Sequence, residues 1–148
     1  MSVARPSDRA LVLGSGSGLM PVLLGLRLGL RHLEVVEPDA DRFTYLSEVI
    51  KENRLIRATW HTAVPADFRP TLIIADLARD PTAALPDVGK MDGLRALVLC
   101  LPETRPEIAE VFDHAATGGL TYFPRQSCGN VVTFLSRWHR AAGTVAMP

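Results

Sequence analysis

A short apolar run that leads straight into a glycine-rich turn is the feature that most limits how this chain can fold. The run covers residues 10–13, and Gly14, Gly16 and Gly18 alternate with serines after it. Unbroken Leu and Val suit a strand covered on both faces, while glycine allows positive φ angles and close approach of a ligand. An apolar segment of helix length follows, and its free N–H groups and positive dipole end would face the turn. The stretch therefore predicts a strand, a tight turn and a helix that together can receive a ligand.

The rest of the chain keeps alternating short apolar runs with longer amphipathic segments. Such alternation predicts an α/β fold in which most strands are parallel. We expect these strands at residues 10–14, 33–37, 57–61, 71–76 and 96–101. We expect helices at residues 19–29, from a cap at Asp39 or Asp41 to about residue 53, loosely within 81–91, and from Pro106 to Gly118.

Apolar residues at helical spacing predict the buried faces of the first two helices. In the second helix, the core stripe consists of Phe43, Leu46 and Ile50. In the first helix, the residues that share one face are Leu19, Val22, Leu23, Leu26 and Leu30.

The end of the chain changes character, because two β-rich runs replace the alternation of strand and helix. These runs cover residues 120–123 and 130–135, and turn-forming residues separate them. No crossover helix fits in so short a gap, so the last two strands should be antiparallel.

Bulk composition narrows the class of protein. The 148 residues suffice for one domain, which we place over residues 1–148 with loose termini at 1–9 and 140–148. Lys plus Arg number 16, as do Asp plus Glu, so no net charge favours nucleic acid or an anionic membrane. Neither terminus nor interior has a run of the roughly 20 apolar residues that span a bilayer. The two cysteines, Cys100 and Cys128, form no disulfide framework, so we expect a reduced, cytoplasmic protein.

Residue spacing around the turn separates three classes of nucleotide site. A P-loop requires Lys and then Ser or Thr after its last glycine, but Leu19 follows Gly18. A dinucleotide site has the spacing GxGxxG, whereas this turn reads GxGxG. Glu37, nineteen residues beyond Gly18, ends the second strand with a carboxylate that can accept hydrogen bonds from both hydroxyls of a ribose. These residues favour a nucleoside ligand without a pyrophosphate.

The glycine turn at residues 11–18, the acidic strand end at 35–38 and the closing hairpin resemble the class I S-adenosylmethionine-dependent methyltransferases. The resemblance implies a three-layer Rossmann-like methyltransferase fold. Its seven-stranded, mostly parallel sheet would have the strand order 3-2-1-4-5-7-6 and an antiparallel last strand.

Within that superfamily, the segment 36–43 followed by Asn53 is most similar to the FkbM-like methyltransferases. Asp76 and the positions of residues 93–99, 118–119 and 130–134 follow the spacing of that family. The family typically carries an acidic-glycine segment after the aspartate, where this chain reads Leu-Ala-Arg-Asp-Pro.

The resemblance implies S-adenosyl-L-methionine as the cofactor, bound at the carboxyl edge of the sheet. The glycine turn would lie under its methionine part, Glu37 would bind the ribose, and residues after the third strand would lie beside the adenine. The implied cofactor-binding residues are Leu13, Gly14, Ser15, Gly16, Gly18, Glu37, Pro38, Thr62, Ala63 and Asp76.

Asp76, at the end of the fourth strand, is also the residue to which we assign a catalytic role. It would hold a substrate hydroxyl, act as its base, or contact the methionine ammonium, and a structural cap is the remaining alternative. The histidines lack the spacing of a metal site, so we expect no metal.

We therefore expect a methyltransferase that uses S-adenosyl-L-methionine to methylate an oxygen of a small molecule or sugar. The first strand begins by residue 10, so we expect an open site, a site completed in a homodimer, or a non-catalytic Rossmann-like module that binds the cofactor or another protein. An NAD-linked enzyme is a third hypothesis, which the glycine spacing and the hairpin disfavour.

Overall fold

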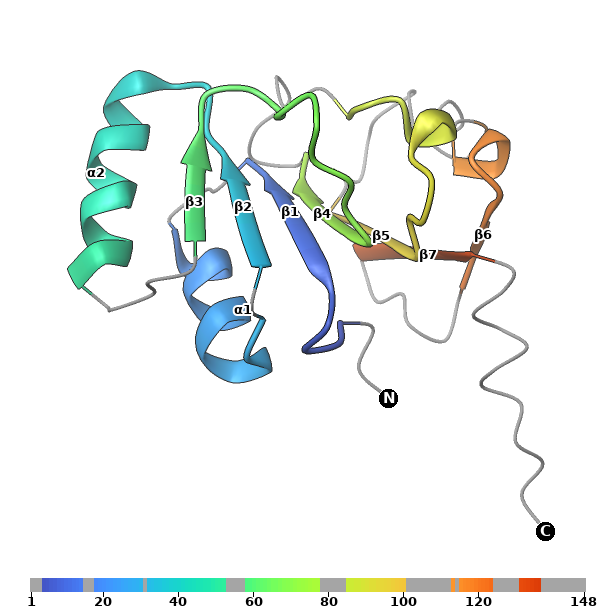
Figure 1. The fold of residues 1–148 in the computed structure, drawn as a ribbon, viewed down its shortest axis with the longest axis horizontal. Coiled ribbons are helices and arrows are strands. Elements are labelled where there is room, and N and C mark those ends of the chain that lie inside the picture. The colour runs from blue at the N-terminus through green and yellow to red at the C-terminus, as the bar shows by residue number, and fades with distance from the viewer. Residues whose placement is uncertain are drawn as a thin grey trace, which may run out of the picture.

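The described part of the chain folds around a single seven-stranded sheet (Figure 1). The computed structural model describes residues 4–14, 18–30, 32–52, 58–77, 85–100, 113, 115–123 and 131–136. The strands lie in the order β3-β2-β1-β4-β5-β7-β6, which confirms the predicted order. Their bounds are Arg9–Leu13 (β1), His32–Val36 (β2), Ala58–His61 (β3), Leu72–Asp76 (β4), Ala96–Cys100 (β5), Leu120–Tyr122 (β6) and Val131–Ser136 (β7).

The direction of the strands changes only at the closing hairpin. Strands β3, β2, β1, β4 and β5 pair in parallel, whereas β7 is antiparallel to both β5 and β6. A parallel pair needs a crossover of a dozen or more residues, and the segment between β6 and β7 is shorter than that. The antiparallel end of the sheet therefore follows directly from the length of this connection.

Two helices, α1 (Leu19–Leu28) and α2 (Ala40–Glu52), cover one face of the sheet, which we call the helical face. Leu24 of α1 packs in one cluster with Val12 and Val35. Phe43 of α2 meets Trp60 of β3 edge to face, with ring centroids 6.1 Å apart. In Figure 1, α1 lies behind the sheet and α2 flanks β3.

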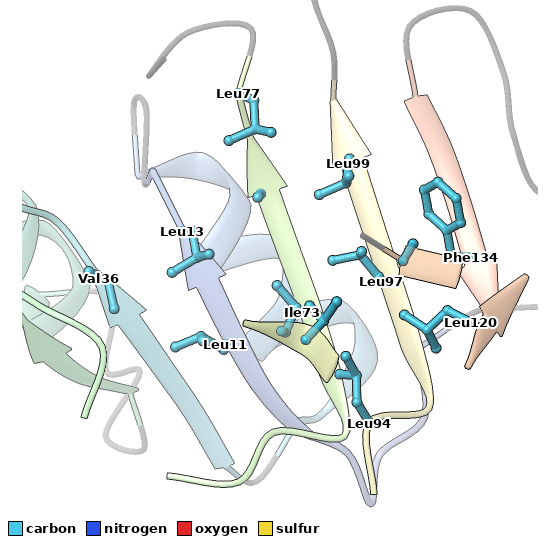
Figure 2. Packing of buried hydrophobic residues seen from close by; sticks show 13 residues of the cluster. Leu11, Leu13, Val36, Ile73, Leu77, Leu94, Leu97, Leu99, Leu120 and Phe134 are labelled. Carbon is cyan, nitrogen blue, oxygen red and sulfur yellow. The ribbon is translucent and has the colours of Figure 1, made fainter. Parts of the chain in front are cut away.

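The opposite face carries the larger apolar cluster (Figure 2). Leu11, Ile73, Leu99 and Phe134 meet there from four different strands. In the described part of the chain, this face is covered by short segments, among them the 3₁₀ turn η1 (Val88–Lys90), whose Val88 is 1% exposed. Apolar side chains on both faces give the parallel strands the unbroken hydrophobic runs seen in the sequence.

Two predictions about helices need correction. Leu23 and Leu26 of α1 are 43% and 62% exposed, whereas Leu24 is buried. The helix is apolar on nearly every side, so the spacing of its leucines could not identify the buried face. The helix expected within 81–91 is a single 3₁₀ turn in its described part, and residues 81–84 lie outside the description.

The predicted helix before Gly118 is described only at its end, where residues 113 and 115–117 are helical. Gly119 follows with a φ of 73°, and its N–H donates to the carbonyl of Ala116 at 2.9 Å. A left-handed glycine after the last turn is the usual way to end a helix.

A buried polar cluster joins three strands at the amino edge of the sheet, opposite the end that was predicted to bind a ligand. Asp8 is 3% exposed, and its carboxylate pairs with the guanidinium of Arg95. The same carboxylate accepts the hydroxyl of Thr71 at 2.9 Å and the backbone N–H of Arg5 at 2.7 Å. The terminus expected to be loose over residues 1–9 is therefore anchored from Arg5 onward.

Candidate functional site

The carboxyl edge of the sheet brings predicted site residues from four strands to one level. The last residue of β1 is in register with the last residue of β2 and with the penultimate residue of β4. Gly14, Glu37 and Asp76 therefore lie beside one another, and the β2–β3 register puts Thr62 level with Glu37. This edge is where open parallel sheets bind their ligands.

Backbone hydrogen bonds continue past the ends of the strands and connect the first residues that follow them to the neighbouring strands. The N–H of Gly14 donates to the carbonyl of Val36 at 3.3 Å, and the N–H of Glu37 donates to the carbonyl of His61 at 2.9 Å. Gly14 has a φ of 72°, which turns the chain away from the sheet immediately after β1. The chain thus leaves β1 sharply at a buried position directly beside Glu37.

Glu37 is the most deeply buried acidic side chain of the described residues, with an exposure of 0%. Its Oε1 accepts the backbone N–H of Asp39 at 3.1 Å and lies 3.8 Å from Nε of Arg42. A buried carboxylate is costly unless charge and hydrogen bonds compensate it, and both are provided by the turn that follows β2. The predicted ribose-binding residue therefore has a defined position and a cationic neighbour.

Asp39 organises that turn through its side chain and its backbone. Its Oδ1 accepts the N–H of Arg42 at 2.9 Å, and its carbonyl accepts the N–H of Phe43 at 2.8 Å. Asp39 is thus the N-cap of α2, as one of the two predicted alternatives has it. The cap sets the first turn of α2 beside the end of β2.

Gly18 is needed for packing as well as for its turn. It has a φ of 76° and precedes α1, and a Cβ added to it would lie 2.6 Å from Cδ2 of Leu46 on α2. Close approach of the two helices therefore requires glycine here, independently of any ligand. The intervening turn residues Ser15 and Gly16, to which cofactor contacts were assigned, lie outside the described residues.

The other predicted cofactor residues differ in exposure. The side chain of Leu13 is 2% exposed and belongs to the apolar cluster opposite the helical face, so only its backbone can meet a ligand. Pro38, Thr62 and Ala63 are exposed at the carboxyl edge. Their side chains are not part of the core, so they can contact a ligand at the rim of the site.

Asp76 ends β4 and is half-buried, in register with Cys100 at the end of β5. Ala75 belongs to the cluster on the opposite face, so strand alternation directs Asp76 and Cys100 to the helical face. The edge therefore carries a carboxylate from β2 and another from β4, with the glycine end of β1 between them.

Sequence reasoning placed His61 with Thr62 and Ala63 beside the adenine, but it did not predict two polar contacts beside this edge. Nε2 of His61 lies 2.5 Å from Oε2 of Glu34 on the neighbouring strand, and Arg42 lies beside Glu37. A glutamate between the buried Leu33 and Val35 indicates in retrospect that a partner lies across the strands. Arg42 gave no such signal, because its relation to Glu37 depends on how the turn after β2 folds.

Two further observations concern only the described residues. No three His, Cys, Asp or Glu side chains gather there in a way that would hold a metal ion. Neither described helix combines the length and the apolar character needed to cross a bilayer.

Comparison with known proteins connects this geometry to a fold. No protein-family profile and no curated protein matches the sequence. The structure is similar to precorrin-6y C5,15-methyltransferase from Geobacter metallireducens, with a TM-score of 0.67 and 11% identity, covering 90% of this chain and 82% of that one. It is also similar to a SAM-dependent methyltransferase from Aquifex aeolicus, with a TM-score of 0.62 and 12% identity, covering 90% and 82%.

A third similar structure, from Streptococcus agalactiae, is a protein of the NADB-Rossmann superfamily, with a TM-score of 0.63 and 15% identity, covering 90% of this chain and 64% of that one. Similarity at such low identity establishes architecture and leaves the ligand to be argued from the site. The seven-stranded sheet with its antiparallel closing hairpin is the Rossmann-like fold of the class I S-adenosylmethionine-dependent methyltransferases.

Proposed function

We propose that this protein is a methyltransferase that binds S-adenosyl-L-methionine at the carboxyl edge of β1 and β2. The observation that carries the proposal is the buried carboxylate of Glu37, level with the positive-φ Gly14. An ionised carboxylate only accepts hydrogen bonds, so it suits two ribose hydroxyls that donate them. The similarity to a SAM-dependent methyltransferase in fold supports this choice of ligand.

The described residues fit two parts of the cofactor. Glu37 would bind the ribose, and the exposed Thr62 and Ala63 would lie along the adenine. The cofactor would supply a methyl group bonded to a sulfonium, which the acceptor takes in a displacement reaction with the neutral thioether, S-adenosylhomocysteine, as the leaving group. For such a reaction the protein contributes mainly in-line positioning of the acceptor.

The finer proposal concerns the methyl acceptor, which we place at the β4 side of the edge as an oxygen of a small molecule or sugar. Asp76 lies there, on the far side of Gly14 from Glu37. A carboxylate in this position can orient a hydroxyl and take its proton as the oxygen attacks. The similarity of residues 36–43 to the FkbM-like methyltransferases and the balanced charge of the chain support a small acceptor over a nucleic acid.

Calorimetry with S-adenosylhomocysteine and with NAD tests the proposed cofactor. We expect S-adenosylhomocysteine to bind and to raise the unfolding temperature, because a ligand of the native state at 100 times its Kd adds about 2.7 kcal/mol of apparent stability. We expect NAD to do neither. Binding of NAD without binding of S-adenosylhomocysteine would refute the proposal.

The Glu37→Gln variant tests the residue that carries the argument. It removes the negative charge and makes one acceptor into a donor, so S-adenosylhomocysteine should bind at least about tenfold more weakly. Glu48→Gln on the exposed side of α2 is the matched control and should bind like the wild type. Equal affinity in Glu37→Gln and Glu48→Gln would remove Glu37 from the site.

A further inference from the structure

We propose that Arg42 is a positioning residue for the ribose, acting through Glu37. The inference rests on the proposed function and adds to it a residue that the sequence did not single out. Arg42 lies in the first turn of α2, 43% exposed, with Nε 3.8 Å from Oε1 of Glu37.

The turn after β2 gives Arg42 a fixed relation to the carboxylate. Asp39 uses its side chain to bind the N–H of Arg42 at 2.9 Å and its own N–H to bind Oε1 of Glu37 at 3.1 Å. Asp39 therefore binds both the backbone of Arg42 and the carboxylate oxygen of Glu37 that Arg42 faces. The cap therefore fixes the backbone position from which the side chain of Arg42 reaches Oε1 of Glu37.

The pair has a consequence for any ligand that Glu37 binds. Glu37 is buried, and the guanidinium of Arg42 lies beside it. This cation and the N–H of Asp39 approach one oxygen, Oε1, and so orient the carboxylate. A carboxylate of defined orientation is what two hydroxyl donors on adjacent ribose carbons require.

Two ligands that differ only in their ribose hydroxyls distinguish a role of Arg42 in ribose binding from a role in the stability of the fold. We compare S-adenosylhomocysteine with the analogue that lacks both ribose hydroxyls, using calorimetry on the wild type, Arg42→Met and Arg42→Lys. Arg42→Met should weaken S-adenosylhomocysteine about threefold to tenfold, a modest loss because the ion pair is partly exposed. It should leave the affinity for the hydroxyl-free analogue unchanged, and Arg42→Lys should restore most of the lost affinity.

Lys51→Met is the matched control, because it removes one exposed positive charge from the other end of the same helix. It should bind both ligands like the wild type. In a Glu37→Gln background, Arg42→Met should have no further effect, because the two residues act as a unit.

The outcomes distinguish the two proposals. Failure of the wild type to bind S-adenosylhomocysteine overturns the proposed function and this inference together. Binding by the wild type with equal affinity in Arg42→Met overturns the inference alone. An equal loss for both ligands also overturns it, because Arg42 would then act on the fold or on another part of the cofactor.

Discussion

The carboxylate of Asp8 and the guanidinium of Arg95 form a buried ion pair across 87 positions of sequence. Nε of Arg95 donates to Oδ1 of Asp8 at 3.1 Å, and its Nη2 donates to Oδ2. The pair joins the segment before β1 to the segment before β5, and Thr71 before β4 bonds to the same carboxylate. Three strands that are far apart in the chain are thus held in register at the amino edge of the sheet.

Breaking this pair on one side should destabilise the protein strongly. Asp8→Asn removes the carboxylate charge that faces the buried guanidinium of Arg95, and breaking a buried ion pair on one side typically costs about 3 kcal/mol or more. Urea unfolding monitored by circular dichroism measures the change. Lys90→Ala, which breaks an exposed ion pair with Asp87, is the control and should leave the unfolding midpoint unchanged. Equal stability of the two variants would show that Asp8 and Arg95 do not hold the edge.

The contribution of Asp8 should disappear in acid. Burial raises the pKa of Asp8, but hydrogen bonds from Arg95, from the backbone of Arg5 and from Thr71 outweigh it, so the pKa lies below its ordinary value of 3.8. A carboxylate with a lowered pKa in the folded state stabilises the protein above the unfolded-state pKa, and this stabilisation is lost as pH falls through the folded-state pKa.

We therefore expect the difference in unfolding free energy between the wild type and Asp8→Asn to be constant from pH 7 to about pH 5 and to shrink below about pH 4. Urea titrations at several pH values measure this difference. A difference that grows as the pH falls would contradict the assigned direction of the pKa shift.

Gly18→Ala should destabilise the protein by more than its backbone angle alone explains. The left-handed φ of 76° costs a non-glycine residue about 1–2 kcal/mol, and the new Cβ would lie 2.6 Å from Cδ2 of Leu46. Gly29→Ala separates the two costs, because Gly29 has a φ of 61° and nothing within 4 Å of its added Cβ.

We expect Gly18→Ala to lower the unfolding free energy by about 1 kcal/mol more than Gly29→Ala. This excess should vanish when Leu46→Ala is the common background. Chemical denaturation of the four variants supplies the values, and an excess that persists without Leu46 would mean that the crowding comes from elsewhere.

Binding of two ligands to the Asp76→Asn variant shows whether Asp76 contacts the cofactor or the methyl acceptor. S-adenosylhomocysteine carries an ammonium group and adenosine does not, whereas both carry the ribose. If Asp76 binds the ammonium, the variant should bind S-adenosylhomocysteine about tenfold more weakly and adenosine unchanged, since a charged hydrogen bond is lost. Because we place Asp76 at the methyl acceptor, we expect unchanged affinity for both ligands, as in the exposed control Asp92→Asn. Weaker binding of S-adenosylhomocysteine alone would contradict this placement and assign Asp76 to the ammonium.

Much of the fold follows from local pattern. Spacing and residue type predicted the five parallel strands, a cap of α2 at Asp39 or Asp41, and a stripe of Phe43, Leu46 and Ile50. The structure confirms the strands, selects Asp39 as the cap, and buries Leu46 and Ile50, while Phe43 is partly buried. Each depends on residues within a few positions of one another, where periodicity and capping chemistry act directly. Leu23 and Leu26 show the limit, because a helix with apolar residues on nearly all sides carries no information about its buried face.

The candidate site, like the fold, has features that local sequence predicts and features that only the tertiary structure determines. The residue types in the glycine turn and Glu37 already favour a nucleoside, because positive φ angles and a strand-end carboxylate are chemical properties of single positions. Their level alignment with Asp76 depends on the strand register, and the neighbours Arg42 and His61 depend on a turn and on a strand pairing. Local sequence therefore determines which groups are present, while long-range packing determines which of them meet, because contacts such as Asp8–Arg95 form only when separate segments are brought together by burial of the two apolar faces.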